Sequence, residues 1–167
     1  MGQLVDGIWQ KEALLKKTED GAFRRAESRF RNWVTVDGAA GPSGMSGFKA
    51  EAGRYHLYIS HACPWAHRTA IFRKLKGLVD LISLSVTHWD MGEMGWSFAA
   101  GEGVVPDPIK DAEYVHQIYQ AADTQYSGRA TVPILWDKHQ NTIVSNESAD
   151  IIRMFNSAFD HVGARAG

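Results

Sequence analysis

HACPWAHR, residues 61–68, is the stretch around which the rest of the chain is organised, and it holds the only cysteine of 167 residues. The residues before it, Tyr55–Ser60, are rich in aromatic and β-branched side chains and predict a strand. The residues after it, Ala66–Lys76, predict a helix that ends at a glycine, with Pro64 suited to the first helical position. We therefore expect Cys63 at a strand-to-helix turn, facing the positive end of a helix dipole. Such a position favours the thiolate over the thiol, so the sequence predicts a nucleophilic cysteine.

The composition is that of an ordinary folded domain, with 44% hydrophobic and 22% charged residues. Eighteen basic residues against nineteen acidic ones give a net charge of −1. This balance argues against nucleic acid or an anionic membrane surface as a partner. The sequence contains no apolar run long enough to cross a membrane, and Met1–Leu4 does not begin a secretory signal. Because one cysteine cannot form an internal disulfide, we expect a reducing, cytoplasmic location.

Residues 1–53 lack a clean hydrophobic period and predict an extension to the folded domain. The segment Phe23–Trp33 mixes aromatic residues with arginines. We interpret it as an arm that packs its rings on the domain and leaves its guanidinium groups in solvent, rather than as a nucleic-acid patch. The glycine-rich stretch Gly38–Gly47 predicts a flexible loop between this arm and the domain, which we expect to span residues 54–160.

The next part of the chain predicts a helix, a strand and a long loop. Ile71, Leu75 and Leu78 recur at spacings of four and three residues, which gives the helix after Cys63 one apolar stripe. Leu81–Val86 alternates apolar residues with serines and predicts a second strand, paired in parallel with the first through a right-handed crossover. A long irregular stretch from Thr87 to Pro108 follows. Loops of this length are usually functional or disordered.

The second half of the chain predicts a helix, a hairpin and a final helix. They cover residues 111–121, then 131–136 with 141–144, and then 147–159. Asp111 and Asn146 are the candidate helix caps. The resulting order of βαβ, α and ββα is typical of the α/β class and of a thioredoxin-like fold, which has a four-stranded mixed sheet with helices on both faces.

The presence of a single thiol predicts how a disulfide formed at Cys63 is broken. Cys63-Pro64-Trp65-Ala66 offers no second thiol to resolve a mixed disulfide formed at Cys63. An external thiol must then break that disulfide, and glutathione is the natural cytosolic candidate.

Two further segments predict a site for a glutathione-like peptide. Pro133 begins a strand opposite the Cys63 turn, and in this fold such a proline is usually cis, which leaves the Val132 backbone free to pair with a peptide ligand. The alternative is an ordinary trans proline that opens an edge strand. Glu147 and Ser148 begin the last helix, where free N–H groups attract a carboxylate. Ser148 can add a hydroxyl donor and Glu147 can hold an ammonium, although helix capping alone would also explain both residues.

A metal site at the same turn is not predicted. His61, Cys63 and His67 have a spacing that can in principle supply three ligands. However, the two histidines are expected on opposite sides of the strand–helix turn, and no fourth ligand is near in sequence.

The chain resembles a known family in these segments. CPWAHR at residues 63–68, the Trp96 loop, Thr131–Pro133 and Ser145–Ser148 resemble the Xi-class glutathione transferases, which are the glutathionyl-hydroquinone reductases. The opening MGQLVDG is similar to bacterial members. The resemblance implies that Cys63 attacks the sulfur of a glutathionyl-hydroquinone, releases the hydroquinone and keeps glutathione as a mixed disulfide. A second glutathione then regenerates the thiol.

The resemblance also implies which residues bind glutathione, the co-substrate. They are Trp96, Arg129, Ala130, Thr131, Val132, Glu147 and Ser148, with Pro64 and Pro133 shaping the site. In this interpretation Trp96 stacks against bound glutathione and Arg129 contacts it. Val132 pairs with the cysteinyl backbone of the ligand, while Glu147 and Ser148 take its γ-glutamyl end.

Members of the family are about twice as long as this chain, and they carry an all-helical C-terminal domain. That domain supplies the hydroquinone pocket, with tyrosines that assist the leaving group, and much of the homodimer contact. We therefore expect residues 161–167 to begin a linker, and we expect turnover to depend on the helical domain. A helix face that meets this domain would be an exposed apolar surface in this chain and would favour self-association.

Two alternative functions remain open on the sequence alone. One is a glutaredoxin-like deglutathionylase that acts on protein mixed disulfides. The other is a glutathione-binding or protein-interaction domain without catalysis of its own.

Overall fold

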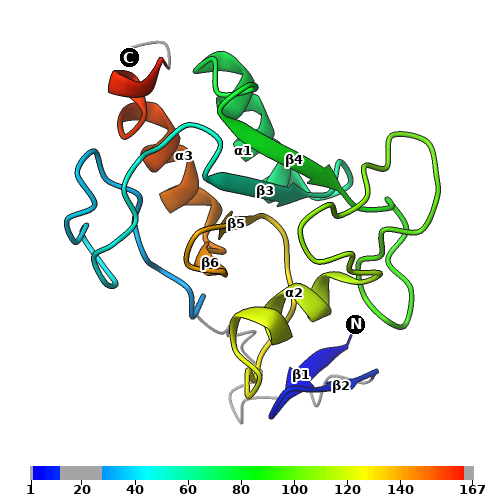
Figure 1. Ribbon diagram of the computed structural model, residues 1–167. Coiled ribbons are helices and arrows are strands. Elements are labelled where there is room, and N and C mark those ends of the chain that lie inside the picture. Colours follow the sequence, from blue (N-terminus) through cyan, green and yellow to red (C-terminus); the bar gives the residue numbers. More distant parts are fainter. Residues whose placement is uncertain (1, 12–27, 164–167) are drawn as a thin grey trace, which may run out of the picture.

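A computed structural model describes residues 2–11 and 28–163 of the chain, and it contains a two-stranded sheet, a four-stranded sheet and three α-helices (Figure 1). The elements are β1 (Gln3–Val5), β2 (Ile8–Gln10), β3 (Tyr55–Ile59), α1 (Pro64–Leu75), β4 (Ile82–Val86), α2 (Val115–Ala122), β5 (Ile134–Asp137), β6 (Thr142–Ser145) and α3 (Ser148–Ser157). The larger sheet has the strand order β4-β3-β5-β6. Strands β3 and β4 are parallel and the other two pairs are antiparallel. This mixed sheet with its helices confirms the predicted thioredoxin-like fold.

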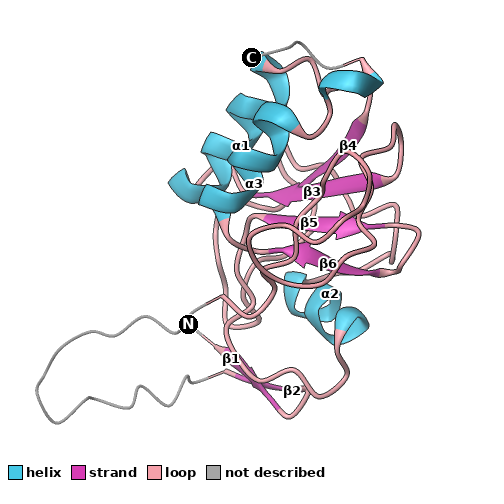
Figure 2. Cartoon of the chain, turned by 90° about the vertical axis from the view of Figure 1, so that its left-hand side faces the viewer, coloured by secondary structure: helices cyan, strands magenta, loops and turns pink. Residues whose placement is uncertain are grey.

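The helices and one long loop cover the two faces of the sheet. Helices α1 and α3 lie side by side on one face (Figure 2), where the Tyr55 ring of β3 meets Phe159 edge to face at 5.8 Å. Because side chains alternate along a strand, Tyr58 points to the other face. There its phenol donates a hydrogen bond to Asp107 of the long loop at 2.9 Å, and its ring contacts Phe98. Helix α2 lies next to β6.

A buried histidine joins the two parallel strands. One ring nitrogen of His56, Nδ1, lies 2.7 Å from the Ser83 hydroxyl, and the other, Nε2, lies 2.9 Å from the Ser85 hydroxyl. The Ser85 hydroxyl in turn donates to the Pro106 carbonyl at 2.9 Å, which ties β4 to the long loop. Burial lowers the pKa of His56 to about 4, since desolvation disfavours the imidazolium form.

We expect the stability of the chain to fall as the pH drops from 6.5 toward 4. In that window the unfolded chain binds a proton at His56 that the folded chain does not bind, so the contribution of this residue is complete only above 6.5. The loss at pH 4 amounts to about 3 kcal/mol. Urea unfolding of the unmodified chain and of His56→Gln at pH 7.5, 5.5 and 4.5 measures it. If the free energy of unfolding fell equally with pH in the two proteins, His56 would not be the source of the loss.

Helix α1 is confirmed, but its apolar stripe does not face the core. The helix begins at Pro64, the residue that the sequence favours for its first position, and Leu78 just beyond its end is buried. The side of α1 that packs inward instead presents the small residues Ala66 and Thr69, which allow the helix to approach its neighbours closely. Three large apolar residues of α1 and one from the turn after it are 46–62% exposed, and we call them the α1 stripe: Trp65, Ile71, Leu75 and Val79.

We predict that the α1 stripe causes self-association of this chain and that Leu75→Glu weakens it. Covering a leucine side chain in a contact is favourable by about 1.5–3 kcal/mol, so the change is expected to raise the dissociation constant by about tenfold or more. Light scattering over a range of concentrations measures the effect. Lys74→Glu, an exposed change on the same helix, serves as the control. A strictly monomeric unmodified chain at high concentration would contradict the prediction.

The start of α2 differs from the sequence prediction. Asp111 does not cap the helix, because it adopts a left-handed backbone conformation with φ of 52°. The residue that organises this segment is the buried Asp107, whose carboxylate accepts hydrogen bonds from three backbone N–H groups between residues 109 and 112. Residues 111 and 112, which we assigned to the first turn of the helix, belong to this Asp107 turn instead. Helix α2 therefore begins only at Val115.

The N-terminal hairpin of β1 and β2 was not predicted from the sequence. Its turn is Asp6-Gly7, with φ values of 47° and 76°, and this dipeptide strongly favours a two-residue hairpin. The hairpin packs on the domain, since the backbones of Leu4 and Gly128 exchange hydrogen bonds at 2.8 and 2.9 Å. Trp9 stacks on His116 of α2 with ring centroids 4.5 Å apart.

The arm is described only in part, because residues 23–27 of Phe23–Trp33 lie outside the described residues. The ring of Phe30 packs on Tyr126 at 5.7 Å, as we expected of an arm. Arg31 does not leave its guanidinium group entirely in solvent, since its Nε donates to the buried Asp150 carboxylate at 2.6 Å. The domain boundaries that we placed at residues 53 and 160 stay predictions.

Candidate functional site

Four segments of the chain meet at one edge of the four-stranded sheet. Strands β3 and β4 are parallel, and β6 runs in the same direction because it pairs antiparallel with β5. The carboxyl ends of these three strands and the amino end of β5 therefore share one edge. The segments that leave this edge are the Cys63 turn, the long loop after β4, the Val132–Pro133 segment before β5 and the start of α3. Almost every residue that the sequence singled out lies on them.

Cys63 occupies the predicted position between β3 and α1. It is the N-cap residue of the helix, with Pro64 at the first helical position, and its backbone N–H donates to the Ser60 carbonyl at 3.2 Å. Its side chain is half-buried, and the Sγ atom donates to the carbonyl of Val132 at 3.6 Å. The thiol thus lies at the amino end of a helix and against the backbone of the neighbouring segment.

The peptide bond between Val132 and Pro133 is cis, as the sequence predicted. Both residues are buried. The segment before them is held by α2, because the Tyr119 hydroxyl donates to the Thr131 carbonyl at 2.9 Å and accepts from the Asn146 side chain at 3.0 Å. One tyrosine of α2 therefore joins the segment beside Cys63 to the segment that leads into α3.

The start of α3 differs from the prediction in its cap. Asn146 does not cap this helix, since its side chain is engaged with Tyr119. The cap is Glu147, whose carboxylate accepts a hydrogen bond from the backbone N–H of Ala149 at 3.2 Å. Ser148 is the first residue of the helix and is buried.

Arg68 connects the Cys63 helix to the start of α3, a role that the sequence analysis did not assign. Its Nε and Nη2 atoms donate to the Ser148 hydroxyl at 3.1 and 2.5 Å, and Nη2 lies 3.9 Å from the Glu147 carboxylate. The guanidinium group also lies 5.0 Å from the centre of the Trp65 ring. Arg68 follows Trp65 by three residues on α1, and this spacing was the available signal, because such residues are neighbours on a helix surface.

Trp96, Arg129 and Ala130 lie on segments that flank the turn. The carbonyl of Trp96 accepts a hydrogen bond from the N–H of Val115 at 2.9 Å, so the long loop is attached to the start of α2. The carbonyl of Arg129 accepts a hydrogen bond from the Tyr126 hydroxyl at 3.3 Å. The structure thus brings Cys63 together with Val132, and Ser148 and Glu147 together with Arg68, whereas the backbone of Trp96 is tied to α2.

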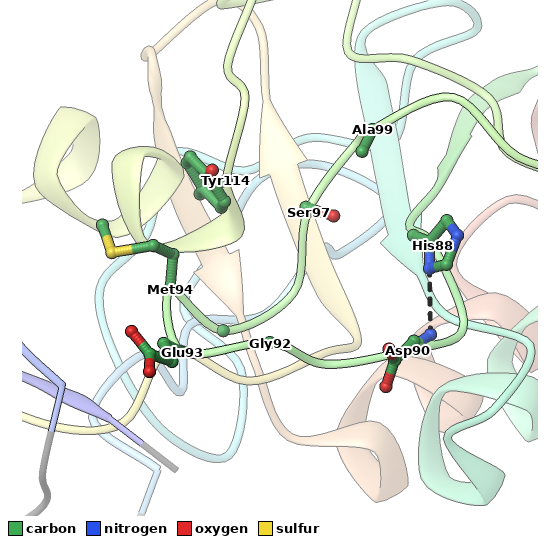
Figure 3. Close-up of a pocket in the computed structure, with 9 residues that line it drawn as sticks. His88, Asp90, Gly92, Glu93, Met94, Ser97, Ala99 and Tyr114 are labelled. Carbon is green, nitrogen blue, oxygen red and sulfur yellow. Dashed lines mark hydrogen bonds between the residues drawn. The ribbon is translucent and has the colours of Figure 1, made fainter.

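The long loop also forms a shallow hollow of about 320 Å³ that the sequence did not predict. Figure 3 shows Tyr114 and Met94 on one side of it and His88 with Asp90 on the other, where the Asp90 N–H donates to the His88 ring at 3.1 Å. Its lining comes from residues on both sides of Trp96 but does not include Cys63.

Within residues 2–11 and 28–163, no three histidine, cysteine or acidic side chains are arranged to hold a metal ion. The expectation that His61 and His67 lie on opposite sides of the turn is wrong, because their rings meet edge to face with centroids 6.1 Å apart. In the same part of the chain, no helix has the length and apolar character needed to span a membrane.

Comparison with known proteins identifies the family. The family described as glutathione S-transferase, N-terminal domain, matches residues 62–158, which is more than half of the chain and includes the Cys63 turn and all of α3. The chain belongs to the glutathione S-transferase family. The matched residues lie within the part of the chain that has the thioredoxin-like fold.

Individual members of the transferase family cover the chain more fully. Glutathionyl-hydroquinone reductase YqjG of Escherichia coli (strain K12) is 57% identical over 168 residues, which is all of this chain and 51% of the relative. The glutathione-bound structure of YqjG has a TM-score of 0.86 and 54% identity over 99% of this chain and 48% of that chain. The glutathione S-transferase Xi structure from Phanerochaete chrysosporium has a TM-score of 0.77 and 48% identity, covering 84% of this chain and 45% of that one. The resemblance to the Xi class is confirmed, and the chain spans about half the length of the relatives that it matches.

Proposed function

We propose that this chain is the glutathione-binding part of a glutathionyl-hydroquinone reductase and that Cys63 is its nucleophile. The observation that carries the proposal is the position of the only cysteine, half-buried at the amino end of α1 with its Sγ atom 3.6 Å from the Val132 carbonyl. The similarity to YqjG, named a glutathionyl-hydroquinone reductase, supports the same assignment.

The proposed ligand is a glutathionyl group that lies across the edge of the sheet with its sulfur at Cys63. The Val132 backbone pairs with the cysteinyl part of the ligand, as in strand addition. The amino end of α3, with Glu147 and Ser148, takes the γ-glutamyl end, because the positive end of the helix dipole favours a carboxylate there. Trp96 and Arg129, with Ala130 and Thr131, complete the proposed contacts.

The first chemical step transfers the glutathionyl group to the protein. The thiolate of Cys63 attacks the sulfur of the glutathionyl-hydroquinone and forms a disulfide bond. The bond between that sulfur and the aromatic carbon breaks, and its electron pair stays on the carbon, which takes up a proton. The ring is thereby reduced to the free hydroquinone, while the two sulfur atoms are oxidised to the disulfide.

The second step restores the thiol. A glutathione thiolate attacks the mixed disulfide, leaves as oxidised glutathione and releases the Cys63 thiolate. An external thiol is required because the chain has no second cysteine. In this proposal glutathione is a co-substrate, and glutathionylated hydroquinones are the substrates.

Intact mass measurement of the chain after mixing with a glutathionyl-hydroquinone tests the proposal. We expect one glutathione adduct per chain and one equivalent of free hydroquinone, followed by loss of the adduct when reduced glutathione is added. A chain that binds glutathione reversibly but forms no adduct would contradict the proposal. Equal reactivity toward a glutathionylated peptide would instead favour the deglutathionylase alternative.

A further inference from the structure

We propose that Arg68 is a positioning residue that makes the start of α3 selective for the α-carboxylate of a γ-glutamyl group. The inference rests on the proposed function and adds a residue from α1 to it. Its basis is the set of contacts that joins Arg68 to Ser148 and Glu147, the two residues at the amino end of α3.

The hydrogen of the Ser148 hydroxyl has a direction that Arg68 determines. A serine hydroxyl has one hydrogen to donate and two lone pairs that accept. Two N–H groups of Arg68 point at the oxygen of Ser148, at 3.1 and 2.5 Å, so the guanidinium group occupies its accepting side. The hydroxyl hydrogen must then point away from Arg68, and Ser148 becomes a fixed donor, which is the role that a carboxylate ligand needs.

Arg68 also balances the negative charge at the start of α3. Glu147 is the cap of α3, and its negative charge by itself would repel a carboxylate that approaches the end of the helix. The Arg68 guanidinium lies 3.9 Å from this carboxylate and offsets its charge. The pair thus presents one positive and one negative group, which matches the carboxylate and the ammonium of a γ-glutamyl end.

Neighbouring side chains hold Arg68 and Glu147 in place. Its guanidinium group lies 5.0 Å from the centre of the Trp65 ring, within the range of a cation–π contact. The other carboxylate oxygen of Glu147 accepts a hydrogen bond from the Ser28 hydroxyl at 3.3 Å. The arginine side chain keeps 33% of its surface exposed, whereas Ser148 is only 4% exposed. Arg68 therefore contacts the buried Ser148 while remaining accessible to a ligand.

Calorimetric titration with three ligands tests the proposal. The first ligand is S-methylglutathione, which binds without exchanging a disulfide. The second carries 4-aminobutyryl in place of γ-glutamyl and lacks the α-carboxylate, and the third carries glutaryl and lacks the α-amino group. The proteins are the unmodified chain, Arg68→Gln and Arg153→Gln, which removes an exposed arginine from α3 and serves as the matched control.

We expect Arg68→Gln to bind S-methylglutathione about 10- to 100-fold more weakly, since hydrogen bonds to charged groups have effects of this size. The glutaryl ligand, which keeps the carboxylate, should show a similar loss. The 4-aminobutyryl ligand should bind Arg68→Gln and the unmodified chain equally, and Arg153→Gln should behave as the unmodified chain with every ligand.

Two results would overturn the positioning role while leaving the proposed function intact. One is unchanged binding of S-methylglutathione by Arg68→Gln. The other is an equal loss for all three ligands, which is the result expected if Arg68 only supports the fold. Failure of the unmodified chain to bind S-methylglutathione would overturn the proposed glutathione site itself, and the role of Arg68 with it.

Discussion

Replacing Cys63 with alanine is expected to abolish formation of the glutathione adduct completely, while reversible binding of glutathione stays within about threefold of the unmodified chain. Adduct formation requires a sulfur atom, and the chain has no other cysteine that could take over. The groups proposed to hold the ligand are the Val132 backbone and the amino end of α3, and neither depends on the thiol. Intact mass after mixing with a glutathionyl-hydroquinone measures the first effect, and calorimetry measures the second.

Cys63→Ser is the matched control for the shape of the turn. It keeps a hydrogen-bond donor that can reach the Val132 carbonyl, but a serine hydroxyl is a far weaker nucleophile than a thiolate unless a base activates it. We therefore expect no adduct in this variant either. If both variants lost glutathione binding as well as the adduct, the assignment of Cys63 as a nucleophile rather than a structural residue would be contradicted.

The centre of the candidate site was predictable because its geometry is set by residues close in sequence. A strand, a cysteine, a proline at the first helical position and a helix follow one another within a few residues, and together they place Cys63 at the amino end of α1. The same holds for the turn of the β1–β2 hairpin. Asp6-Gly7 is a sufficient local signal for that turn, although the strands on either side of it are too short to show a clear hydrophobic period.

The errors lie where contacts between distant segments decide the structure. Asn146 is an acceptable cap by residue type, but Tyr119, which is far away in sequence, takes its side chain and leaves Glu147 to cap α3. Asp111 lost its expected role in the same way, because Asp107 collects the backbone N–H groups of that turn. A single sequence does not show which of two suitable polar residues a distant partner will engage.

The apolar stripe of α1 illustrates a different ambiguity. Periodic spacing identifies a helix with one apolar side, but it does not say what that side contacts. Here the sheet and α3 accept the side with Ala66 and Thr69, and the side with Ile71 and Leu75 remains exposed. Arg68 lies between these two sides, and its guanidinium group reaches the Ser148 hydroxyl at the start of α3.

Replacing Asp137 with alanine is expected to lower the free energy of unfolding by about 3–5 kcal/mol, the cost of leaving a buried charge without its partner. Asp137 at the end of β5 is fully buried, and its carboxylate is bridged by Nε and Nη2 of Arg54, at 2.5 Å for the shortest contact. The arginine side chain is itself only 7% exposed and would keep its charge. Urea unfolding at pH 7.5 measures the loss.

Glu51→Ala provides the matched control for this ion pair. Glu51 also contacts Arg54, with its carboxylate 3.3 Å from Nη1, but its side chain is 39% exposed, so its removal is expected to cost less than about 1 kcal/mol. A comparable loss for both variants would contradict the distinction between the buried and the exposed partner. Since Asp137 pairs with Tyr55, at the end of β3 away from Cys63, folded Asp137→Ala should still form the glutathione adduct. The ion pair beside the first residue of β3 would then affect stability alone, while the chemistry would depend on Cys63 after the last residue of the same strand.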